Sequence, residues 1–250
     1  MELPIIMENV DKSYPVGLKK RKILHNISIG IRPGEVFGFI GPNGAGKSTL
    51  INLLMGFTRM DRGKILIHGI SPMEPASRRQ IGYLPEGPRF YENLHAAELL
   101  RFGGSVARVR KEKLESDIDS LLKKLEILHV KNRPISTYSK GMKQRLGLAL
   151  AMIHDPSTLI LDEPMSGLDP IGRALLKNII LDLKRQGKTI FFSSHILNDV
   201  ETLCDRIGVI NQGRILYNGL ANGLREENED IEDAFVRMIQ TQHKSEQSDG

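Results

Sequence analysis

Residues 41–49 read GPNGAGKST, a complete phosphate-binding loop of the pattern G-x-x-x-x-G-K-[ST]. Its glycines allow successive backbone N–H groups to surround the phosphates of a nucleotide, Lys47 can reach the β- and γ-phosphates, and the Ser48 hydroxyl can bind Mg²⁺. A chance glycine-rich turn is the alternative. The flanking sequence disfavours it, because residues 35–40 predict a buried strand before the loop and residues 50–55 predict a helix after it. The chain is therefore expected to bind a nucleoside triphosphate. The loop residues expected at the nucleotide are Gly41, Pro42, Asn43, Gly44, Ala45, Gly46, Lys47, Ser48 and Thr49.

The composition is that of an ordinary globular protein. Its 250 residues are enough for one domain with a sizeable core and a subdomain. The sequence shows neither a signal peptide nor an apolar run of ~18 residues, so no membrane-spanning segment is expected. Cys204 is the only cysteine, which predicts no internal disulfide and indicates a reducing compartment.

Part of the net charge of +5 lies in one basic run, KKRK at residues 19–22. A run of this kind can contact nucleic acid or lipid headgroups. No aromatic residues alternate with these charges, as they do on surfaces that stack bases. We interpret the run as a solvated loop between two strands and expect no nucleic-acid partner.

Alternating strands and helices predict an α/β fold. Residues 3–40 are rich in short β-like runs. From about residue 93 to residue 155, apolar residues recur at spacings of three and four, which indicates helices. The later β-like runs alternate with helical stretches, as in parallel βαβ units; they lie at 159–161, 190–192 and 207–210. The last of them is expected to form a hairpin with residues 215–217.

Two carboxylates follow one of these runs. Asp162 and Glu163 come directly after the apolar residues 158–161. In a phosphate-loop enzyme, an aspartate at a strand end holds Mg²⁺, and Glu163 is well placed to polarise an attacking water. A strand followed by an acidic turn is the alternative. The phosphate loop earlier in the chain favours the catalytic interpretation.

Residues 137–146 precede a helix, and Ser139 occupies the position of an N-cap. The N-terminus of a helix attracts anions through its unpaired N–H groups and its dipole. Taken alone, this segment is equally an ordinary capped helix.

The order of these motifs resembles that of the ATP-binding subunits of ABC transporters, and the resemblance extends from about residue 5 to residue 220. In that family, residues 41–49 correspond to the Walker A loop and residues 159–163 to the Walker B strand with its catalytic glutamate. Residues 138–142 stand at the place of the signature LSGGQ, where the resemblance assigns Ser139 and Gly141 to ATP binding. Residues 166–169 match the D-loop.

Two single residues complete the resemblance. His195 matches the histidine that senses the γ-phosphate, although a strand-end histidine with a satisfied hydrogen bond is the alternative. Tyr14 matches the aromatic residue that stacks on adenine, although it can equally pack on its strand. Lys47, Glu163 and His195 are thus the expected catalytic residues.

The chain departs from the family pattern at two places. The signature has Lys140 for glycine and Met142 for glutamine, and the glutamine of the Q-loop is replaced by Glu86. Glu86 keeps an oxygen ligand for Mg²⁺, so the expected metal-binding residues are Ser48, Glu86 and Asp162. Both departures look like those of ABC exporter ATPases whose membrane subunits are separate chains, and they also occur in a relative that serves copper-site assembly.

The resemblance implies a P-loop NTPase core with an N-terminal antiparallel β part and an inserted helical subdomain at about 88–155. It implies an ATP-binding domain over residues 1–225; for residues 226–250 we expect a short helix near residue 235 and a disordered tail from about 242. ATP and Mg²⁺ are the expected cofactors. The expected role is ATP hydrolysis that energises export through a separate transmembrane permease, at the cytoplasmic face of the membrane. Two copies are expected to form a homodimer around ATP.

Other functions are less well supported. A copper-site assembly system and a soluble, non-transport ABC ATPase are the alternatives. Repair members of the family carry a long heptad insertion, and translation members usually carry two ATPase halves; this sequence has neither. A nucleotide-binding regulator without turnover is disfavoured by Glu163, and an importer by the lack of a large C-terminal regulatory domain. The cargo is not encoded in recognisable motifs.

The segment after Glu86, residues 87–94, carries two aromatics in a loop that contains proline and glycine. Phe90 and Tyr91 have the composition of an interface anchor, and in the family this region receives the permease. Either residue can instead fill the core of the helical subdomain.

Overall fold

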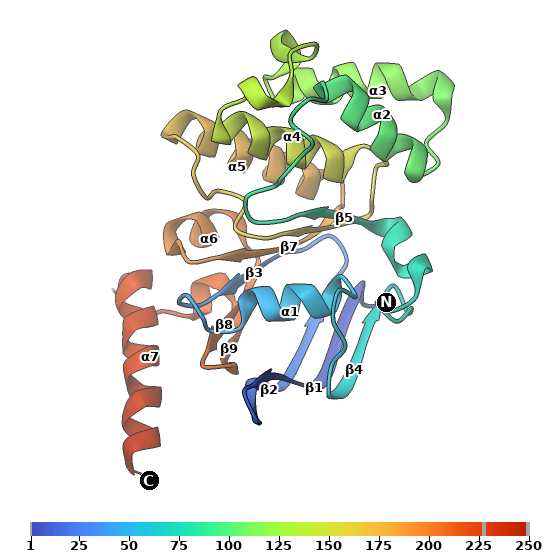
Figure 1. Ribbon diagram of the computed structural model, residues 1–250. Helices are drawn as coiled ribbons and strands as arrows, with labels where there is room; N and C mark the ends of the chain where they lie inside the picture. The colour runs from blue at the N-terminus through green and yellow to red at the C-terminus, as the bar shows by residue number, and fades with distance from the viewer. Residues whose placement is uncertain (1, 227–228, 249–250) are drawn as a thin grey trace.

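The computed structural model describes residues 2–226 and 229–248. A helical group lies above a mixed six-stranded sheet, and a smaller antiparallel sheet lies below it (Figure 1). The expected α/β fold is confirmed.

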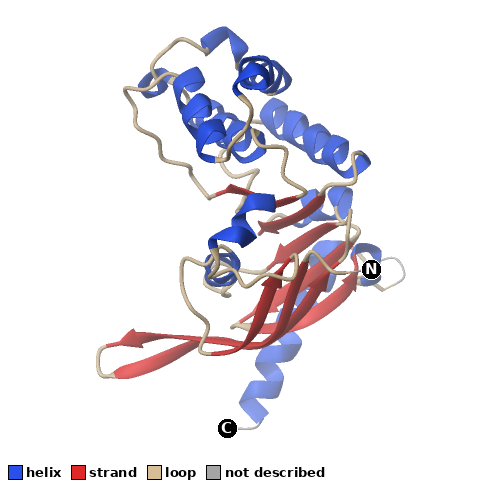
Figure 2. Cartoon of the chain, turned by 90° about the vertical axis from the view of Figure 1, so that its right-hand side faces the viewer, coloured by secondary structure: helices blue, strands red, loops and turns tan. Residues whose placement is uncertain are grey.

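The smaller sheet contains three antiparallel strands in the order β2-β1-β4. Its strands are β1 (Ile5–Val16), β2 (Lys19–Ile31) and β4 (Arg62–Ile67). Apolar residues alternate with exposed ones along the ends of β1 and β2 nearest the core, so that one face is buried. The N-terminal antiparallel part is therefore confirmed. The β1–β2 ribbon continues beyond the core as a projecting arm (Figure 2).

The larger sheet has the order β5-β6-β7-β3-β8-β9. Its strands are β3 (Val36–Ile40), β5 (Ile81–Leu84), β6 (Thr158–Leu161), β7 (Thr189–Ser194), β8 (Arg206–Asn211) and β9 (Arg214–Leu220). All neighbours pair in parallel except β9, which forms the expected antiparallel hairpin with β8. The inner strands are covered on both faces, which explains their continuous apolar runs.

Helices cover both faces of this sheet. Helix α1 (Lys47–Leu54) lies between the two sheets, and α5 (Pro170–Arg185) and α6 (Leu197–Leu203) lie on the opposite face (Figure 1). The helical group consists of α2 (Ala96–Val106), α3 (Lys111–Lys124) and α4 (Lys140–Met152). Short 3-10 turns join these elements at Pro75–Gln80, Leu128–Val130, Ile135–Thr137 and Ala221–Gly223.

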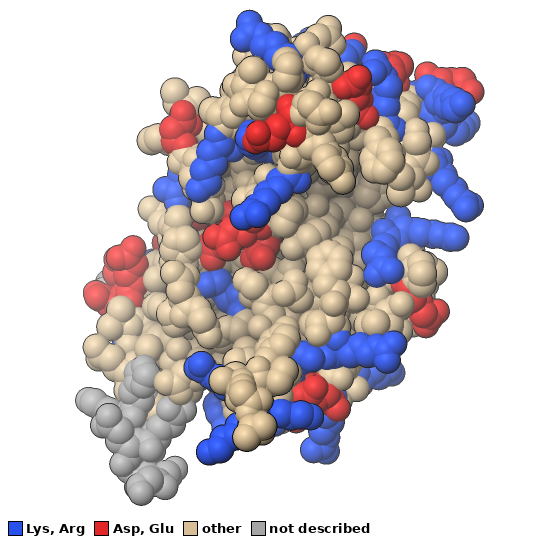
Figure 3. Space-filling model, in the orientation of Figure 1, with Lys and Arg blue, Asp and Glu red and all other residues tan. Residues whose placement is uncertain are grey.

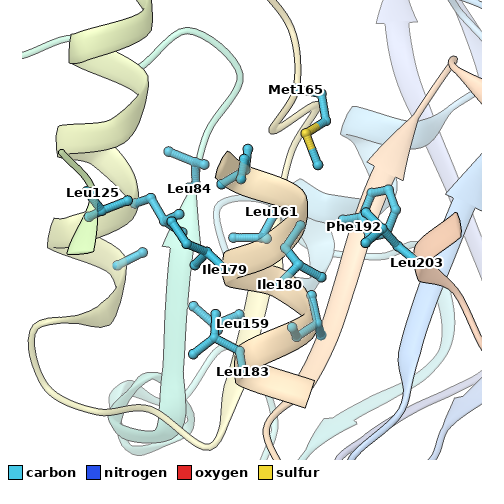
Figure 4. Close-up of a cluster of buried hydrophobic side chains, with 14 of the residues drawn as sticks. Leu84, Leu125, Leu159, Leu161, Met165, Ile179, Ile180, Leu183, Phe192 and Leu203 are labelled. Atoms are coloured by element: carbon cyan, nitrogen blue, oxygen red, sulfur yellow. The ribbon is translucent and has the colours of Figure 1, made fainter. Parts of the chain in front are cut away.

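Two hydrophobic clusters hold the layers together. One fills the space between the sheets, where the ring of Phe191 packs on Phe37 and Phe39 at centroid distances of 6.0 and 5.6 Å. The other extends from the large sheet through α5 into the helical group, where Leu125 and Leu84 lie near Ile179 (Figure 4). Because this cluster is continuous, the helical group is packed on the sheet as part of the same core.

The C-terminal helix is longer than the sequence suggests. Helix α7 spans Ile231–Ser248, so residues 242–248, expected to be disordered, are helical; residues 249–250 lie outside the described residues. Its first turns bury Ile231 and Ala234 against the core, and the Asn211 amide donates to Gln242 Oε1 at 2.9 Å. This packing fixes one end of the helix, and Lys244, Glu246 and Gln247, which follow, are good helix formers.

Gly82 permits close contact between β5 and α4. A Cβ added at Gly82 would lie 2.1 Å from the Ala151 carbonyl oxygen and 2.8 Å from Leu159. We therefore expect Gly82→Ala to lower the free energy of unfolding by about 1–3 kcal/mol, the usual effect of overpacking. Denaturant unfolding would measure it. Gly141→Ala is the control, since its added Cβ meets nothing closer than 3.5 Å; equal stability of the two variants would contradict this account of the contact.

Candidate nucleotide-binding site

The site is formed where neighbouring parallel strands end. Strands β6, β7 and β3 are adjacent, so the residues that follow their carboxyl ends meet at one edge of the sheet. These are the phosphate loop after β3, Asp162 and Glu163 after β6, and His195 after β7. Sequence positions more than 100 residues apart are thus brought together, as the motif order predicts.

A cavity of about 460 Å³ opens at this edge. Its walls come from the β1–β2 ribbon, the phosphate loop and the carboxylate-bearing ends of β5 and β6; the lining residues are Tyr14, Arg21, Ile23, Pro42, Asn43, Gly44, Gly46, Lys47, Ser48, Thr49, Glu86, Glu163 and His195. On the face shown in Figure 3, Lys and Arg side chains are interspersed with Asp and Glu. Of the expected site residues, Gly41, Ala45, Asp162, Ser139 and Gly141 are absent from this lining.

The phosphate loop has a conformation that requires glycine. Gly44 and Gly46 have φ values of +81° and +113°, and Gly46 caps α1. The Lys47 ammonium lies over the loop and donates to the Gly41 and Pro42 carbonyl oxygens at 2.6 and 3.4 Å. The Ala45 carbonyl in turn accepts from the Gly213 N–H, which anchors the loop to the β8–β9 turn. The geometry is that of an anion cradle at a helix N-terminus.

Glu163 is held between two other expected catalytic residues. Its Oε1 lies 3.4 Å from Lys47 Nζ, and its Oε2 lies 2.8 Å from His195 Nδ1. Its side chain is only 9% exposed, and its φ of +46° places it in the left-handed region. The Glu163 N–H donates to Ser193 Oγ at 2.9 Å, which helps to hold this conformation. A hydrogen-bonded carboxylate that faces the cavity from a strained backbone position is suited to orienting and polarising a water molecule.

Asp162 lies beneath Glu163 and is buried. Ser193 Oγ donates to its Oδ1 at 2.7 Å. Burial raises the pKa of the Asp162 carboxyl, the Ser193 hydrogen bond lowers it, and the negative charges of Glu86 and Glu163 raise it further. A cation near these three carboxylates would relieve this repulsion.

The donor set expected for Mg²⁺ fits that ion. Ser48, Glu86 and Asp162 supply only oxygen donors, which Mg²⁺ prefers, and Mg²⁺ usually completes its shell with water and substrate phosphate. Among residues 2–226 and 229–248, no group of three or more His, Cys, Asp and Glu side chains is arranged to hold a metal ion by itself.

The wall of the cavity near Tyr14, where the nucleotide base is expected, contains residues that the sequence motifs do not identify. The Lys12 ammonium lies 4.9 Å from the centroid of the Tyr14 ring, and Lys12 also donates to the Arg59 carbonyl at 2.6 Å. This cation–π contact supports the ring. Arg21 and Ile23 line the same wall from β2. Lys12 and Ile23 belong to no recognisable motif. Arg21 belongs to the basic run at 19–22, which was expected to be a solvated loop but instead begins β2, so only the pairing of β1 with β2 reveals its position.

The expected signature segment lies at the N-terminus of α4, outside the cavity. Ser139 Oγ accepts from the Met142 N–H at 3.2 Å, which confirms the predicted N-cap. A Cβ added at Gly167 would lie 2.5 Å from Lys140 Nζ, so Lys140 covers the segment 166–169. Asp169 caps α5 by accepting from the Gly172 N–H at 2.6 Å. Within one chain, therefore, Ser139 and Gly141 do not contribute to the cavity.

Comparison with known proteins gives a consistent result. The family model described as "ABC transporter" matches residues 24–166. A Synechocystis protein described as an uncharacterised ABC transporter ATP-binding protein is 42% identical over 229 residues, which are 87% of this chain and 65% of that protein. The lantibiotic transport ATP-binding protein SrtF of Streptococcus pyogenes is 40% identical over 93% of this chain and 96% of its own length. The chain thus spans about two thirds of the first relative. A solved structure of an ATP-binding subunit of an ABC transporter superposes with a TM-score of 0.87, at 28% identity, over 95% of this chain and all of its own.

The burial of Asp162 and its repulsion by neighbouring carboxylates predict that this residue makes the stability of the fold depend on pH. A raised pKa means that the folded chain holds this proton more tightly than the unfolded chain does, so the charged carboxylate lowers stability at neutral pH. In EDTA at pH 8, Asp162→Asn is expected to raise Tm by a few degrees, as ~1 kcal/mol would in a chain of this size.

The advantage of Asp162→Asn should shrink as the pH falls through the raised pKa, because the wild-type carboxyl is then neutral in the folded chain. Thermal unfolding between pH 5 and 8 measures this. A lower Tm for Asp162→Asn at pH 8 would contradict the assignment. Asp182→Asn is the control. Asp182 is a half-buried carboxylate on α5 that forms ion pairs with Arg185 and Lys124, and the Arg185 hydrogen bond lowers its pKa, so its replacement should not gain stability with rising pH.

Proposed function

Because this chain belongs to the ABC transporter family of ATP-binding proteins, we propose that it hydrolyses ATP and thereby energises export through a separate transmembrane permease. The observation that carries the proposal is the placement of Glu163 between Lys47 and His195 at the cavity. A site that only binds nucleotide has no need for a buried carboxylate on a strained backbone at this place. The similarity to proteins named for transport supports the coupling to a membrane partner.

Phosphoryl transfer to water depends mainly on positioning and on neutralising charge. Tyr14, supported by Lys12, is placed to stack on the base. The loop N–H groups and Lys47 surround the phosphates. Glu163 orients and polarises the attacking water, and His195 fixes the Glu163 carboxylate and contacts the γ-phosphate. Ser48, Asp162 and Glu86 would hold Mg²⁺, which supplies positive charge to the phosphates when bound.

Two copies of the chain are needed for a complete site. Ser139 and Gly141 lie at a helix N-terminus, which favours phosphate, but they do not line the chain's own cavity. In the proposed homodimer, this segment of one copy closes the cavity of the other over ATP. The side chain of Ile171, two residues after Asp169, is 74% exposed and is available to such a contact.

The permease is proposed to bind the helical side of the molecule. In the part of the chain that the structure describes, no helix combines the length and the apolarity that a bilayer crossing requires. The loop after Glu86 leads from β5 to the helical group (Figure 1). Its Tyr91 is 79% exposed, and Phe102 on α2 is 68% exposed. Exposed aromatics of this kind are typical interface anchors. A permease bound there would hold the chain peripherally at the cytoplasmic face of the membrane.

Glu163→Gln tests the proposed reaction and the dimer together. The amide keeps the size of the side chain but removes the base, so turnover should fall by at least 100-fold, or about 2.7 kcal/mol of barrier, while ATP still binds. Sizing chromatography with ATP should then show a dimer. Glu86→Gln is the matched control and should retain substantial activity, because an amide oxygen can still bind Mg²⁺. Equal losses would show that the roles are wrongly divided, and a monomer at saturating ATP would exclude the composite site.

Tyr91→Ala tests the docking surface. It should keep ATPase activity and Tm but reduce recovery of the protein with membranes that contain its permease, because an exposed anchor is lost. Phe90 packs partly against the helical core, so Phe90→Ala should lower Tm. Val236→Ala on α7 is an exposed control. Unchanged membrane recovery of Tyr91→Ala would remove this loop from the interface.

A further inference from the structure

The projecting β1–β2 ribbon presents a cation to the nucleotide cavity. Tyr14 and Arg21 are directly paired in the antiparallel register, so their side chains lie on the same face of the ribbon. Arg21 lines the cavity beside Tyr14. It also lines a second hollow of about 360 Å³, together with Asn43 and Gly44 of the phosphate loop. Arg21 therefore stands between the base side and the phosphate side of the site.

The other cations near the cavity are engaged. Lys47 contacts Glu163 and the loop carbonyls, Lys12 donates to the Arg59 carbonyl, and Lys22 lies 2.8 Å from Asp11. Among the contacts within residues 2–226 and 229–248, the Arg21 guanidinium has no ion pair and no side-chain hydrogen bond. Its charge is thus available to a ligand in the cavity.

We propose that Arg21 is a further nucleotide-contacting residue, whose guanidinium binds the phosphates of the triphosphate from the ribbon side; this rests on the proposed function. A guanidinium presents its N–H groups as a rigid fork that matches phosphate oxygens. The rest of the phosphate site consists of backbone N–H groups and one ammonium, so Arg21 adds a second positive side chain opposite the loop. Neighbouring residues of the basic run at 19–22 therefore have different surroundings: Arg21 lines the cavity, whereas Lys22 pairs with Asp11.

The test compares Arg21→Gln with Lys20→Gln. Lys20 is adjacent on the same strand, is exposed and lines neither hollow, so it reports general charge effects. Affinity for ATP and for adenosine is measured by competition with a fluorescent ATP analogue at two salt concentrations. Arg21→Gln should bind ATP about 10-fold more weakly, the effect of one charged phosphate contact, and should bind adenosine as the wild type does. The salt dependence of ATP binding should also decrease, and Arg21→Lys should recover part of the affinity.

Three results would overturn the proposal. The first is a loss of ATP affinity in Arg21→Gln no larger than that in Lys20→Gln; the second is an equal loss of affinity for ATP and adenosine; the third is ATP binding that keeps the full salt dependence. The second result would point to a distorted ribbon. Failure of the proposed function is seen separately, because the wild type would then not bind ATP or Lys47→Ala would bind it equally well. The same two variants are tested with duplex DNA and with anionic vesicles. If the wild type binds either one and both variants weaken that binding equally, the basic run at 19–22 serves that partner instead.

Discussion

The contact between Lys47 and Glu163 is the interaction on which the site depends. Lys47 belongs to the helix that follows β3, and Glu163 follows β6, so the 3.4 Å contact joins two elements separated by β7 in the sheet. Both side chains are nearly buried, and a buried charge without a partner costs several kcal/mol. The sheet order, the loop conformation and the positive φ of Glu163 are therefore coupled: each is needed for the two charges to meet. His195 then binds the carboxylate oxygen that Lys47 leaves open.

The site places three charged side chains in a nearly buried position, where charge contributes least to the stability of the fold. Counted over the whole residue, Asp162, Glu163 and Lys47 are each less than 8% exposed, although the surrounding strands are apolar. Ser193 compensates in part, since its hydroxyl donates to Asp162 and accepts from the Glu163 backbone. The repulsion among carboxylates is not removed, and it favours binding of a cation. The residues proposed to do the chemistry thus lower the stability of the fold, as is usual at functional sites.

The sequence was enough to predict the parts of this site that are formed by residues close together in the chain. The phosphate loop, the strand-end carboxylates and the Ser139 cap depend on residues close together in the chain, and the alternation of strands and helices predicted the parallel sheet. The adjacency of β6, β7 and β3 needed the motif order as well. The placement of Lys12 and Arg21 beside the cavity could not be predicted, because it depends on the register of two strands, which contains bulges. The predicted length of α7 was wrong for a similar reason. The polar residues at its end resemble a disordered tail in the sequence, but tertiary contacts of Ile231 and Gln242 stabilise the helix.

The helical group is connected to the cavity by more than apolar packing. Gln144 on α4 is buried and donates to the Pro164 carbonyl at 3.2 Å, next to Glu163. Lys143 pairs with Glu92 at 2.8 Å, in the loop that follows Glu86. The helix that carries the signature segment is thus tied to both carboxylate-bearing loops of its own cavity. Because that segment is proposed to serve the partner's cavity, a displacement of Glu86 or Glu163 in one site would move a part of the other. The two sites of a dimer would then be linked through α4 within each chain, without requiring any direct contact between the two nucleotides.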